Sequence, residues 1–385
     1  MASPRYFFSF FPQFTPDPLN DAAWGPGFTD WDLIRAMPDA AGASFRPAGA
    51  MYDTADPDYL KMLNEELKSL GDQPVGLMVY HYFFDGRHVL DGFERNLIAA
   101  AETPPFFLCW ANETWSKRWI GKAGEIIIEQ RHIADPAIIA DHVARLLQLF
   151  AKPAYLHIDG RPVLMVYNPL ASATLSASIE LYRQAFAAAG VHPLIGTCLP
   201  HDVDPATVAA FDFLCEFQPR FFYTLATNSA VVRLAARAKT LAPALIERIG
   251  GLRDQYRAKA SGRRYRYHDY LARLADGTIE RRLRAICGEK PLMRATFLSW
   301  DNRPRYQDRN TMVVHDGVEG VDLAPIAAIR SDASFPILVN SWNEWSEGAA
   351  LEPASEPHRL RRAFLDWILG SVKASGSGDE RSDRS

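Results

Sequence analysis

The sequence has few cysteines, and none of them are spaced for metal binding. The four residues are Cys109, Cys198, Cys215 and Cys287, in a chain of 385 residues. Zinc sites and small disulfide-bonded secreted domains need closely spaced cysteines, usually in C-x-x-C pairs. Because three of the four lie inside apolar runs, we expect buried thiols, no disulfide framework and a cytoplasmic location.

A surplus of basic charge and long apolar runs are also absent. The formal net charge is -4, which argues against nucleic-acid binding because that requires a basic surface. No stretch approaches the roughly 18 apolar residues of a membrane-spanning helix. The early run YFFSFF is interrupted by Pro12 and Gln13, so it is too short for the core of a signal peptide. We expect at most peripheral contact with a membrane.

Motifs for metals and nucleotides are missing as well. The ten histidines are scattered, without the H-E-x-x-H spacing of a zinc site. No G-x-G-x-x-G turn follows an early apolar run, and there is no P-loop. Residues 30–32 and 202–204 have the D-x-D pattern that metal-dependent sugar transferases use, but a three-residue match is common. We expect no metal and no cofactor.

What the sequence does contain is eight short apolar runs typical of buried strands. Such near-continuous runs are expected in parallel sheets that are covered on both faces. The runs are residues 5–11, 74–84, 105–112, 162–168, 192–199, 211–218, 292–300 and 335–342. Most are separated by helical patterns, such as residues 56–71 with four leucines on one stripe. Eight strand–helix repeats favour an α/β fold, a (β/α)8 TIM barrel, over a doubly wound open sheet.

The chain is longer than the about 250 residues that such a barrel needs. A long aromatic- and proline-rich loop follows the first strand, from residue 12 to about residue 57. A helical, Arg-rich insertion, roughly residues 223–290, separates strands six and seven. Residues 374–385 are polar and rich in Gly and Ser, which predicts a disordered tail. Residues 1–373 are expected to form a single domain, since no linker or repeat is visible.

Polar and aromatic residues follow the expected strands, where a barrel has its active site. Carboxylates and amides hydrogen-bond sugar hydroxyls, and aromatic rings pack on the apolar face of a pyranose. The candidate substrate-binding residues are Gln13, His81, Tyr82, Trp110, Asn112, Glu113, Tyr167, Trp300, Asp301 and Asn343. The barrel topology makes them neighbours in space, so they predict an oligosaccharide or polysaccharide as the partner.

For several of these residues an ordinary structural role is the alternative. His81 could be a core histidine bonded to a carbonyl group. Glu113 could form a salt bridge with Lys117 or Arg118. Asp301 could stabilise a turn.

The segment VNSWNEWSEGAALEP, residues 339–353, places Glu344 and Glu347 three residues apart behind the last strand. Cleavage of a glycosidic bond needs one group to protonate the leaving oxygen and another to act as base or nucleophile. Two neighbouring carboxyl groups can also move each other's pKa values apart. A helix cap or a solvated loop is the alternative, but the position after the eighth strand favours a catalytic pair.

Four blocks resemble, in this order, the signature blocks of the WbsX-like proteins. These proteins are related to glycoside hydrolase family 99 and occur among genes for bacterial surface-polysaccharide biosynthesis. The blocks are residues 10–31 (FFPQFTPDPLNDAAWGPGFTDW), 79–90 (VYHYFFDGRHVL), 108–119 (LCWANETWSKRW) and 339–353. The resemblance implies a (β/α)8 fold and retaining α-mannosidase chemistry.

The resemblance also implies roles for individual residues. Glu344 would act as base on the substrate's 2-hydroxyl, which attacks the anomeric carbon to give an epoxide-type intermediate. Glu347 would be the general acid and then the base for water. Asn343, Tyr82, His81 and Trp110 would line the sugar subsites.

Three classes of function remain open. The first is a retaining glycosidase or transglycosidase acting on an α-linked, mannose-like glycan, possibly lipid-linked, in O-antigen or capsule metabolism. The second is a glycosyltransferase of polysaccharide biosynthesis that uses an activated sugar donor. The third is a barrel that binds glycans without turnover. The cytoplasmic location expected above favours a biosynthetic or editing role.

Overall fold

A computed structural model describes most of the chain. The described residues are 4–38, 45–71, 74–117, 122–226, 263–307, 311–315, 322–332, 334–355 and 359–374. Residues 375–385 of the expected tail and residues 227–262 of the expected insertion lie outside them. Within these ranges, no helix is long and apolar enough to cross a bilayer.

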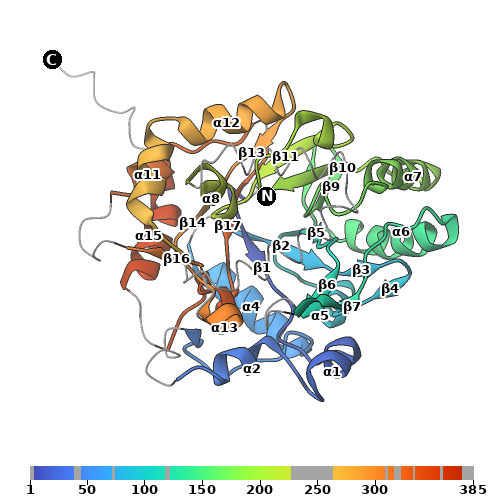
Figure 1. Cartoon of the computed structure of the whole chain (residues 1–385), viewed down its shortest axis with the longest axis horizontal. Coiled ribbons are helices and arrows are strands. Elements are labelled where there is room, and N and C mark those ends of the chain that lie inside the picture. Colours follow the sequence, from blue (N-terminus) through green and yellow to red (C-terminus); the bar gives the residue numbers. More distant parts are fainter. Residues whose placement is uncertain are drawn as a thin grey trace.

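Nine strands, each parallel to its neighbours, form a nearly closed barrel. Their order is β13-β11-β10-β9-β5-β2-β1-β17-β14. Their bounds are β1 (Tyr6–Phe10), β2 (Gly76–His81), β5 (Phe106–Trp110), β9 (Arg161–Val166), β10 (Leu194–Leu199), β11 (Phe213–Glu216), β13 (Leu292–Met293), β14 (Ala295–Phe297) and β17 (Ile337–Asn340). Figure 1 shows the strands at the centre of the molecule with helices around them.

All eight expected strands are present, and the seventh is divided in two. Arg294 separates β13, which pairs with β11, from β14, which pairs with β17. The two ends of the strand order are therefore one residue apart along the chain. This arrangement is consistent with a TIM-like barrel, and the open doubly wound sheet is not observed.

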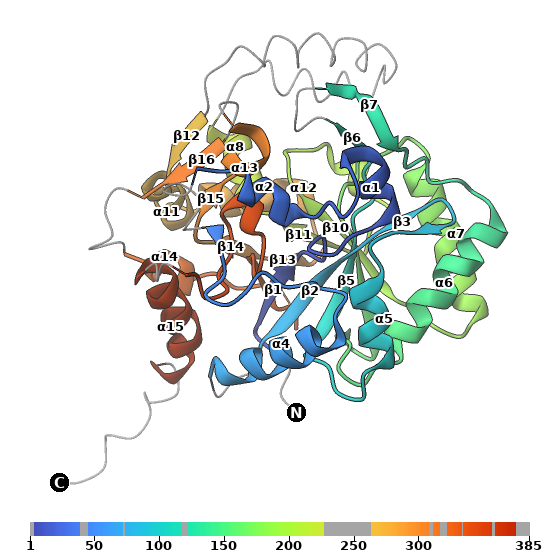
Figure 2. The same cartoon turned by 90° about the horizontal axis from the view of Figure 1, so that it is seen from below.

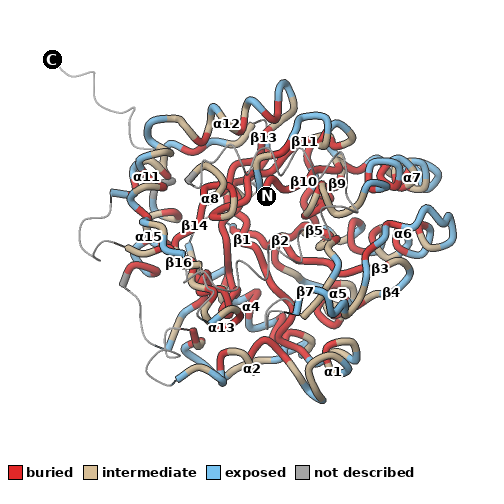
Figure 3. The backbone as a smooth tube through the Cα atoms, in the orientation of Figure 1, coloured by how far each residue is buried: buried red, intermediate tan, exposed pale blue. Residues whose placement is uncertain are grey.

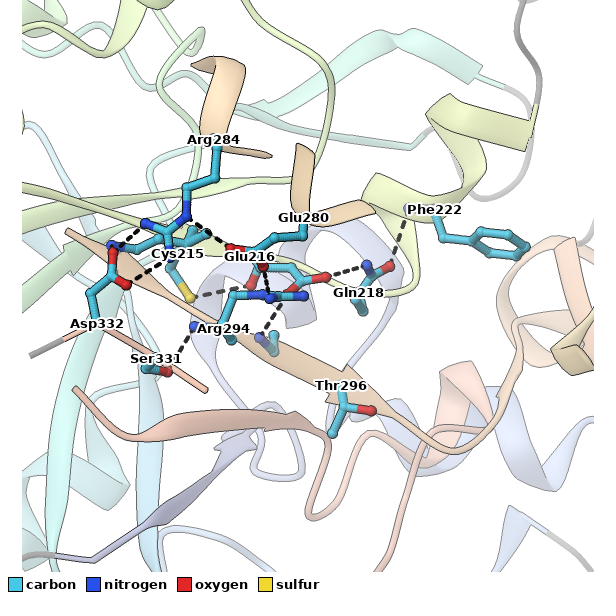
Figure 4. A network of polar contacts seen from close by, with 12 residues as sticks. Cys215, Glu216, Gln218, Phe222, Glu280, Arg284, Arg294, Thr296, Ser331 and Asp332 are labelled. Carbon is cyan, nitrogen blue, oxygen red and sulfur yellow. Dashed lines mark hydrogen bonds and ion pairs between the residues drawn. The ribbon is translucent and has the colours of Figure 1, made fainter. Parts of the chain in front are cut away.

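A buried ion pair lies where the barrel closes (Figure 4). Arg294 Nε is 2.7 Å from Glu216 Oε2 at the end of β11, and the same oxygen accepts the backbone N–H of Ala295 at 3.1 Å. Gln218 Nε2 donates to the other oxygen of Glu216 at 2.6 Å. Arg294 also contacts Glu280 of α12 (Thr278–Cys287). The residue at the split in strand seven is thus a buried cation, Arg294, which contacts one carboxylate from β11 and one from α12.

Two glycines allow aromatic rings to lie against a neighbouring strand. A Cβ added at Gly76 would lie 2.3 Å from the ring of Phe7, and one at Gly196 would lie 2.3 Å from the ring of Phe213. Only hydrogen fits at these points, so the apolar core of the barrel is closely packed. Figure 3 shows the buried residues concentrated in the strands and on the inward sides of the helices. The four cysteines are all buried and unpaired, as expected.

Helices cover the outside of the barrel. The pattern at residues 56–71 is confirmed as α4 (Pro57–Ser69), with Asp56 capping its first turn and Leu60, Leu63 and Leu67 buried. The other long helices are α5 (Gly92–Ala99), α6 (Pro136–Phe150), α7 (Leu175–Ala188), α11 (Tyr267–Ala275), α12 and α15 (Arg359–Ala374). One connection differs from the expected repeat. Residues 200–212 hold only a 3-10 turn, η3 (Pro205–Val208). Pro200 and Pro205 both stand in the first half of this connection, which leaves too few residues before β11 for a longer helix.

Several small elements collect over one end of the barrel, in the upper half of Figure 2. They come from distant parts of the chain: α1 (Pro18–Trp24), α2 (Asp30–Arg35), hairpin β6 (Trp115–Lys117)–β7 (Lys122–Ile128), α8 (Arg220–Ala226), α13 (Arg303–Tyr306) and the sheet of β12 (Arg263–Arg266), β16 (Thr311–Val314) and β15 (Trp300–Asp301). The expected first loop thus holds two short helices. The described part of the insertion is helical, as expected, apart from β12.

Candidate active site

The segment that carries Glu344 and Glu347 follows directly on β17. Its short helix η5 (Trp345–Glu347) packs against α2, α13 and β15. The backbone N–H of Glu344 donates to Ser341 Oγ at 3.0 Å. The next residue after η5, Gly348, has φ +59°, and a Cβ there would lie 2.9 Å from Asp301. This close approach fixes the position of both glutamates at the end of the barrel.

Arg305 joins three carboxylates at this position. Its Nη1 lies 2.5 Å from Glu347 Oε1 and 3.7 Å from Glu344 Oε1, and its Nη2 lies 2.9 Å from Asp30 Oδ2. Ser346 Oγ also donates to Asp30. Glu344 and Glu347 are 6% and 4% exposed. The pair predicted from the sequence is therefore buried and bound to a common cation.

The two glutamates differ in their electrostatic surroundings. Burial raises the pKa of Glu344 to about 8, helped by the nearby charge of Glu347 and opposed by Arg305 and Arg220. Burial alone would lower the pKa of Arg305, but Asp30, Glu347 and Glu344 raise it well above its usual value. Near neutral pH, Glu344 is thus divided between a protonated and an ionised form, whereas Glu347 makes a charge-assisted hydrogen bond to Arg305.

Three tyrosines surround this pair. Tyr80 and Tyr82 are two residues apart at the end of β2, so their side chains leave the strand on the same face. Tyr167 follows β9. Burial raises the pKa of all three, and the nearby charge of Glu344 raises those of Tyr80 and Tyr82 further, while a hydrogen bond with Gln13 lowers that of Tyr82. The predicted residues Tyr82 and Gln13 therefore lie near Glu344, and the predicted Tyr167 lies near Glu347.

The amides of Asn343 and Asn112 are used by the backbone of neighbouring loops. Asn343 accepts the N–H of Phe11 at 2.7 Å and donates to its carbonyl at 2.9 Å. Asn112 makes the same pair of bonds to Asn168, at 2.8 and 3.0 Å. Both side chains are fully buried. Both side chains therefore fix the backbone of the loops that follow β1 and β9.

His81 and Trp110 lie between the strands and the outer helices. His81 Nδ1 is 2.7 Å from Glu94 Oε1, and its Nε2 is 2.6 Å from His142 Nε2. Trp110 Nε1 donates to the carbonyl of Phe83 at 3.0 Å. The contacts of His81 are those of a core histidine with both ring nitrogens satisfied, and neither residue has more than 2% of its surface exposed.

The other predicted residues have partners of their own. Glu113 Oε1 accepts from Asn168 Nδ2 at 2.8 Å. Asp301 is ion-paired with Arg303, 2.6 Å away, and accepts that residue's backbone N–H, which starts α13. Trp300 is 3% exposed and pairs with β16. The charge of Glu113 raises the pKa of Tyr167, and the charge of Asp301 raises the pKa of Tyr223. In both tyrosines the effect is smaller than that of burial.

Four residues of the site were not found from the sequence: Asp30, Tyr80, Arg220 and Arg305. The alternation of tyrosines on one strand was a signal for Tyr80. Asp30 lies in a D-x-D pattern, but its carboxylate binds Arg305 and Ser346. Among the described residues, no group of three or more His, Cys, Asp or Glu is arranged to hold a metal ion.

A family model described as glycosyltransferase WbsX matches residues 7–368. Two curated relatives from two strains of Xanthomonas campestris pv. campestris are both named uncharacterized protein WxcX. They are 29% identical over 378 residues and 30% identical over 373 residues, and each match covers 93% of this chain and 48% of the relative. The chain therefore spans about half the length of these relatives.

Solved structures of low sequence identity share the fold. The GH99 endo-alpha-mannosidase from Bacteroides thetaiotaomicron, in complex with BIS-TRIS-Propane, superposes with a TM-score of 0.54 at 14% identity, over 98% of this chain and 100% of that one. A glycoside hydrolase-like protein gives a TM-score of 0.52 at 11% identity, over 96% and 95%. At these identities the likeness establishes the architecture alone.

Proposed function

The chain belongs to the WbsX family, and from that premise we propose that it is a carbohydrate-active enzyme that breaks a glycosidic bond with Glu344 and Glu347. The proposed chemistry is that of a retaining glycosidase or transglycosidase on an α-linked, mannose-like glycan, on a (β/α)8 barrel. The observation that carries it is a buried pair of glutamates at the carboxyl ends of the strands, both near the guanidinium of Arg305, with the pKa of Glu344 raised to about 8.

In the proposed first step, Glu344 in its ionised form, a fraction of the molecules near neutral pH because its pKa is about 8, takes the proton of the 2-hydroxyl as this oxygen attacks the anomeric carbon. Glu347, in its protonated form and released from Arg305, gives its proton to the departing oxygen, so the alcohol leaves neutral and an epoxide-type intermediate forms. In the second step Glu347 takes a proton from water, the water oxygen bonds to the anomeric carbon, and Glu344 returns its proton to the 2-oxygen. A pKa of about 8 for Glu344 suits this role, because a general base works best when its pKa lies near the operating pH.

The structure also contains an observation that favours the transferase alternative. Glu347 can donate a proton only after its 2.5 Å contact with Arg305 has been given up. A leaving group that departs as a stable anion needs no proton. A glycosyltransferase with an activated donor, as the family's description suggests, is therefore our second candidate function.

We further propose that the substrate belongs to surface-polysaccharide metabolism and is met in the cytoplasm. The resemblance of the four sequence blocks supports the pathway. The four buried, unpaired thiols support a reducing compartment, since free cysteines persist there.

Leaving-group dependence tests the roles of the two glutamates. Glu347→Gln should lose activity on oligosaccharides, whose departing alcohol is basic, and keep the first step on activated aryl glycosides. Glu344→Gln should lose both. Initial rates on the two substrate types measure this. Equal losses for Glu347→Gln on both types would remove it as the acid, and unchanged activity of both variants would leave a glycan-binding barrel.

A further inference from the structure

Arg220 lies beside the glutamate pair. It follows β11 and begins α8. Among the residues that the structure describes, no carboxylate oxygen lies within 4.0 Å of its guanidinium. Its guanidinium lies over the ring of Tyr167, whose centroid is 5.9 Å from Cζ. The residue is half-buried, so this charge is partly removed from water.

The charge of Arg220 nevertheless reaches the reacting groups. Burial alone would lower the pKa of Arg220, but Tyr167, Glu347 and Glu113 raise it well above its usual value. In turn, Arg220 lowers the pKa of Glu344, although its effect is smaller than those of burial, Glu347 and Arg305. Arg220 therefore stands near both catalytic glutamates, at more than contact distance from each.

Every carboxylate near Arg220 already has a closer partner. Glu347 is held by Arg305 at 2.5 Å, and Glu113 accepts from Asn168 at 2.8 Å. Glu344 lies 3.7 Å from Arg305. The guanidinium of Arg220 is thus the cation of the described site whose hydrogen-bond donors remain for a ligand, and a planar guanidinium suits phosphate oxygens.

The state of Glu347 points to the same ligand. A neutral alcohol leaving group would require Glu347 to hold a proton and to break its contact with Arg305. A phosphate leaving group carries away the electron pair of the broken bond as a stable anion, and it gains from a nearby cation as its charge develops. Two independent features, a bound Glu347 and an unbound Arg220, thus fit the same substrate chemistry.

We propose that Arg220 binds the phosphate of a glycosyl phosphate donor and stabilises it as it departs. The bond between the anomeric carbon and the phosphate oxygen breaks, and its electron pair stays on that oxygen. The acceptor oxygen, or first the donor's own 2-oxygen, bonds to the anomeric carbon and gives its proton to Glu344 in its ionised form. This inference rests on the proposed function, and it selects the chemical class of the donor.

Binding measurements test the inference without requiring turnover. The probes are α-D-mannose 1-phosphate, methyl α-D-mannoside and inorganic phosphate, titrated calorimetrically into the full chain with both Glu344 and Glu347 changed to Gln. The variants are Arg220→Gln and Arg220→Lys. The matched control is Arg273→Gln, because Arg273 is also half-buried and also lies over a ring, 5.7 Å from the centroid of Phe222.

We expect Arg220→Gln to weaken binding of mannose 1-phosphate by about 10- to 100-fold, the loss of one charge-assisted contact. Binding of methyl α-D-mannoside should not change, Arg220→Lys should keep part of the affinity, and Arg273→Gln should keep all of it. The inference is overturned if Arg220→Gln weakens both sugars equally, or if mannose 1-phosphate binds the starting protein no better than the methyl mannoside. GDP-mannose and dodecyl phosphomannose, as further probes, show whether the phosphate comes from a nucleotide or a lipid carrier.

Failure of the inference can be told apart from failure of the proposed function. If Arg220→Gln cleaves neutral oligosaccharides at the normal rate and no probe shows phosphate-dependent binding, the glutamate pair works on a different leaving group. If phosphate binds through Arg220 but neither oligosaccharide nor mannose 1-phosphate is turned over, the phosphate-binding role of Arg220 is supported and the proposed reaction of the glutamates is contradicted.

Discussion

The guanidinium of Arg305 contacts carboxylates from Asp30, Glu344 and Glu347 while only 7% exposed. Removing a buried cation of this kind leaves its partners charged and without compensation. We predict that Arg305→Met lowers the free energy of unfolding by about 3–5 kcal/mol, measured by urea denaturation. Arg303→Met is the control, because its ion pair with Asp301 is more exposed and should cost no more than about 1 kcal/mol. Equal losses in the two variants would contradict the buried network.

Glu352 lies behind the same loop and titrates in an unusual range. Tyr52 and Trp345 donate to its Oε2 at 2.6 and 2.8 Å. Burial raises its pKa to about 8, although these two bonds lower it. The folded protein therefore keeps a proton that the unfolded chain releases above its ordinary pKa near 4.5, and stability contributed by this group is lost as pH rises from about 4.5 to about 8.

We predict that Glu352→Gln, which keeps the shape and the acceptor oxygen, raises Tm relative to the unsubstituted protein at pH 8 and changes it little at pH 5. Thermal unfolding at the two pH values measures this. Glu65→Gln is the control, since Glu65 is exposed and should show the same Tm difference at both. A Tm difference for Glu352→Gln that does not grow with pH would show that Glu352 is ionised at both.

At this level the sequence predicted the glutamates but not their partners. Glu344 and Glu347 were found because they stand together behind a strand. Arg305 was not found, because its contact with Asp30 joins residues 275 positions apart, and nothing in either segment marks the pairing. Asn343 was predicted as a sugar ligand from the block that it belongs to, yet both polar groups of its side chain bind Phe11.

Among the secondary-structure elements, β2 is tied to the outer helices by a chain of buried polar groups. Glu94 of α5 bonds to His81, His81 bonds to His142 of α6, and His142 Nδ1 lies 2.7 Å from the hydroxyl of Tyr182 in α7. Burial lowers the pKa of His142 well below its usual value, and His81 and His88 lower it further. The folded protein thus keeps His142 neutral when the unfolded chain would protonate it.

This difference predicts acid sensitivity. Because the unfolded chain takes up a proton below about pH 6.5 that folded His142 does not, stability is lost as pH falls below that value. His142→Gln should reduce the drop in Tm between pH 7 and pH 5, while lowering Tm at pH 7 because the chain of bonds is broken. Exposed His157→Gln is the control and should leave the drop unchanged. An unchanged drop in His142→Gln would contradict a neutral His142.

The barrel strands and the outer helices were more predictable from the sequence than the small elements over the end of the barrel. Continuous apolar runs predicted the barrel strands, because a strand buried on both faces needs apolar residues at every position. The spacing of the leucines predicted α4, because a helix buried on one face needs them only on that face. The helix expected between β10 and β11 is missing, since its connection is short and contains prolines. The small elements over the end of the barrel were not foreseen, because short strands such as β15 depend on contacts with distant segments.

For the molecule as a whole, closure of the barrel depends on Arg294 and Glu216. Both are at most 4% exposed, and they join β11 to the divided seventh strand. We predict that Arg294→Met costs about 3–5 kcal/mol in the free energy of unfolding, because Glu216 would remain buried without its cation. The double variant Arg294→Met/Glu216→Gln should recover part of this loss, measured by urea unfolding. A double variant as unstable as the sum of the single variants would mean that the two side chains do not interact.

The central claim is that Glu344 and Glu347 together transfer a glycosyl group from the anomeric carbon. The most direct test is an NMR time course of the purified protein with α-manno-oligosaccharides and with α-D-mannose 1-phosphate, using the Glu344/Glu347 double Gln variant as blank. We expect new products of retained anomeric configuration in the unsubstituted protein and none in the blank. Products of inverted configuration, or turnover that survives in the double variant, would contradict it.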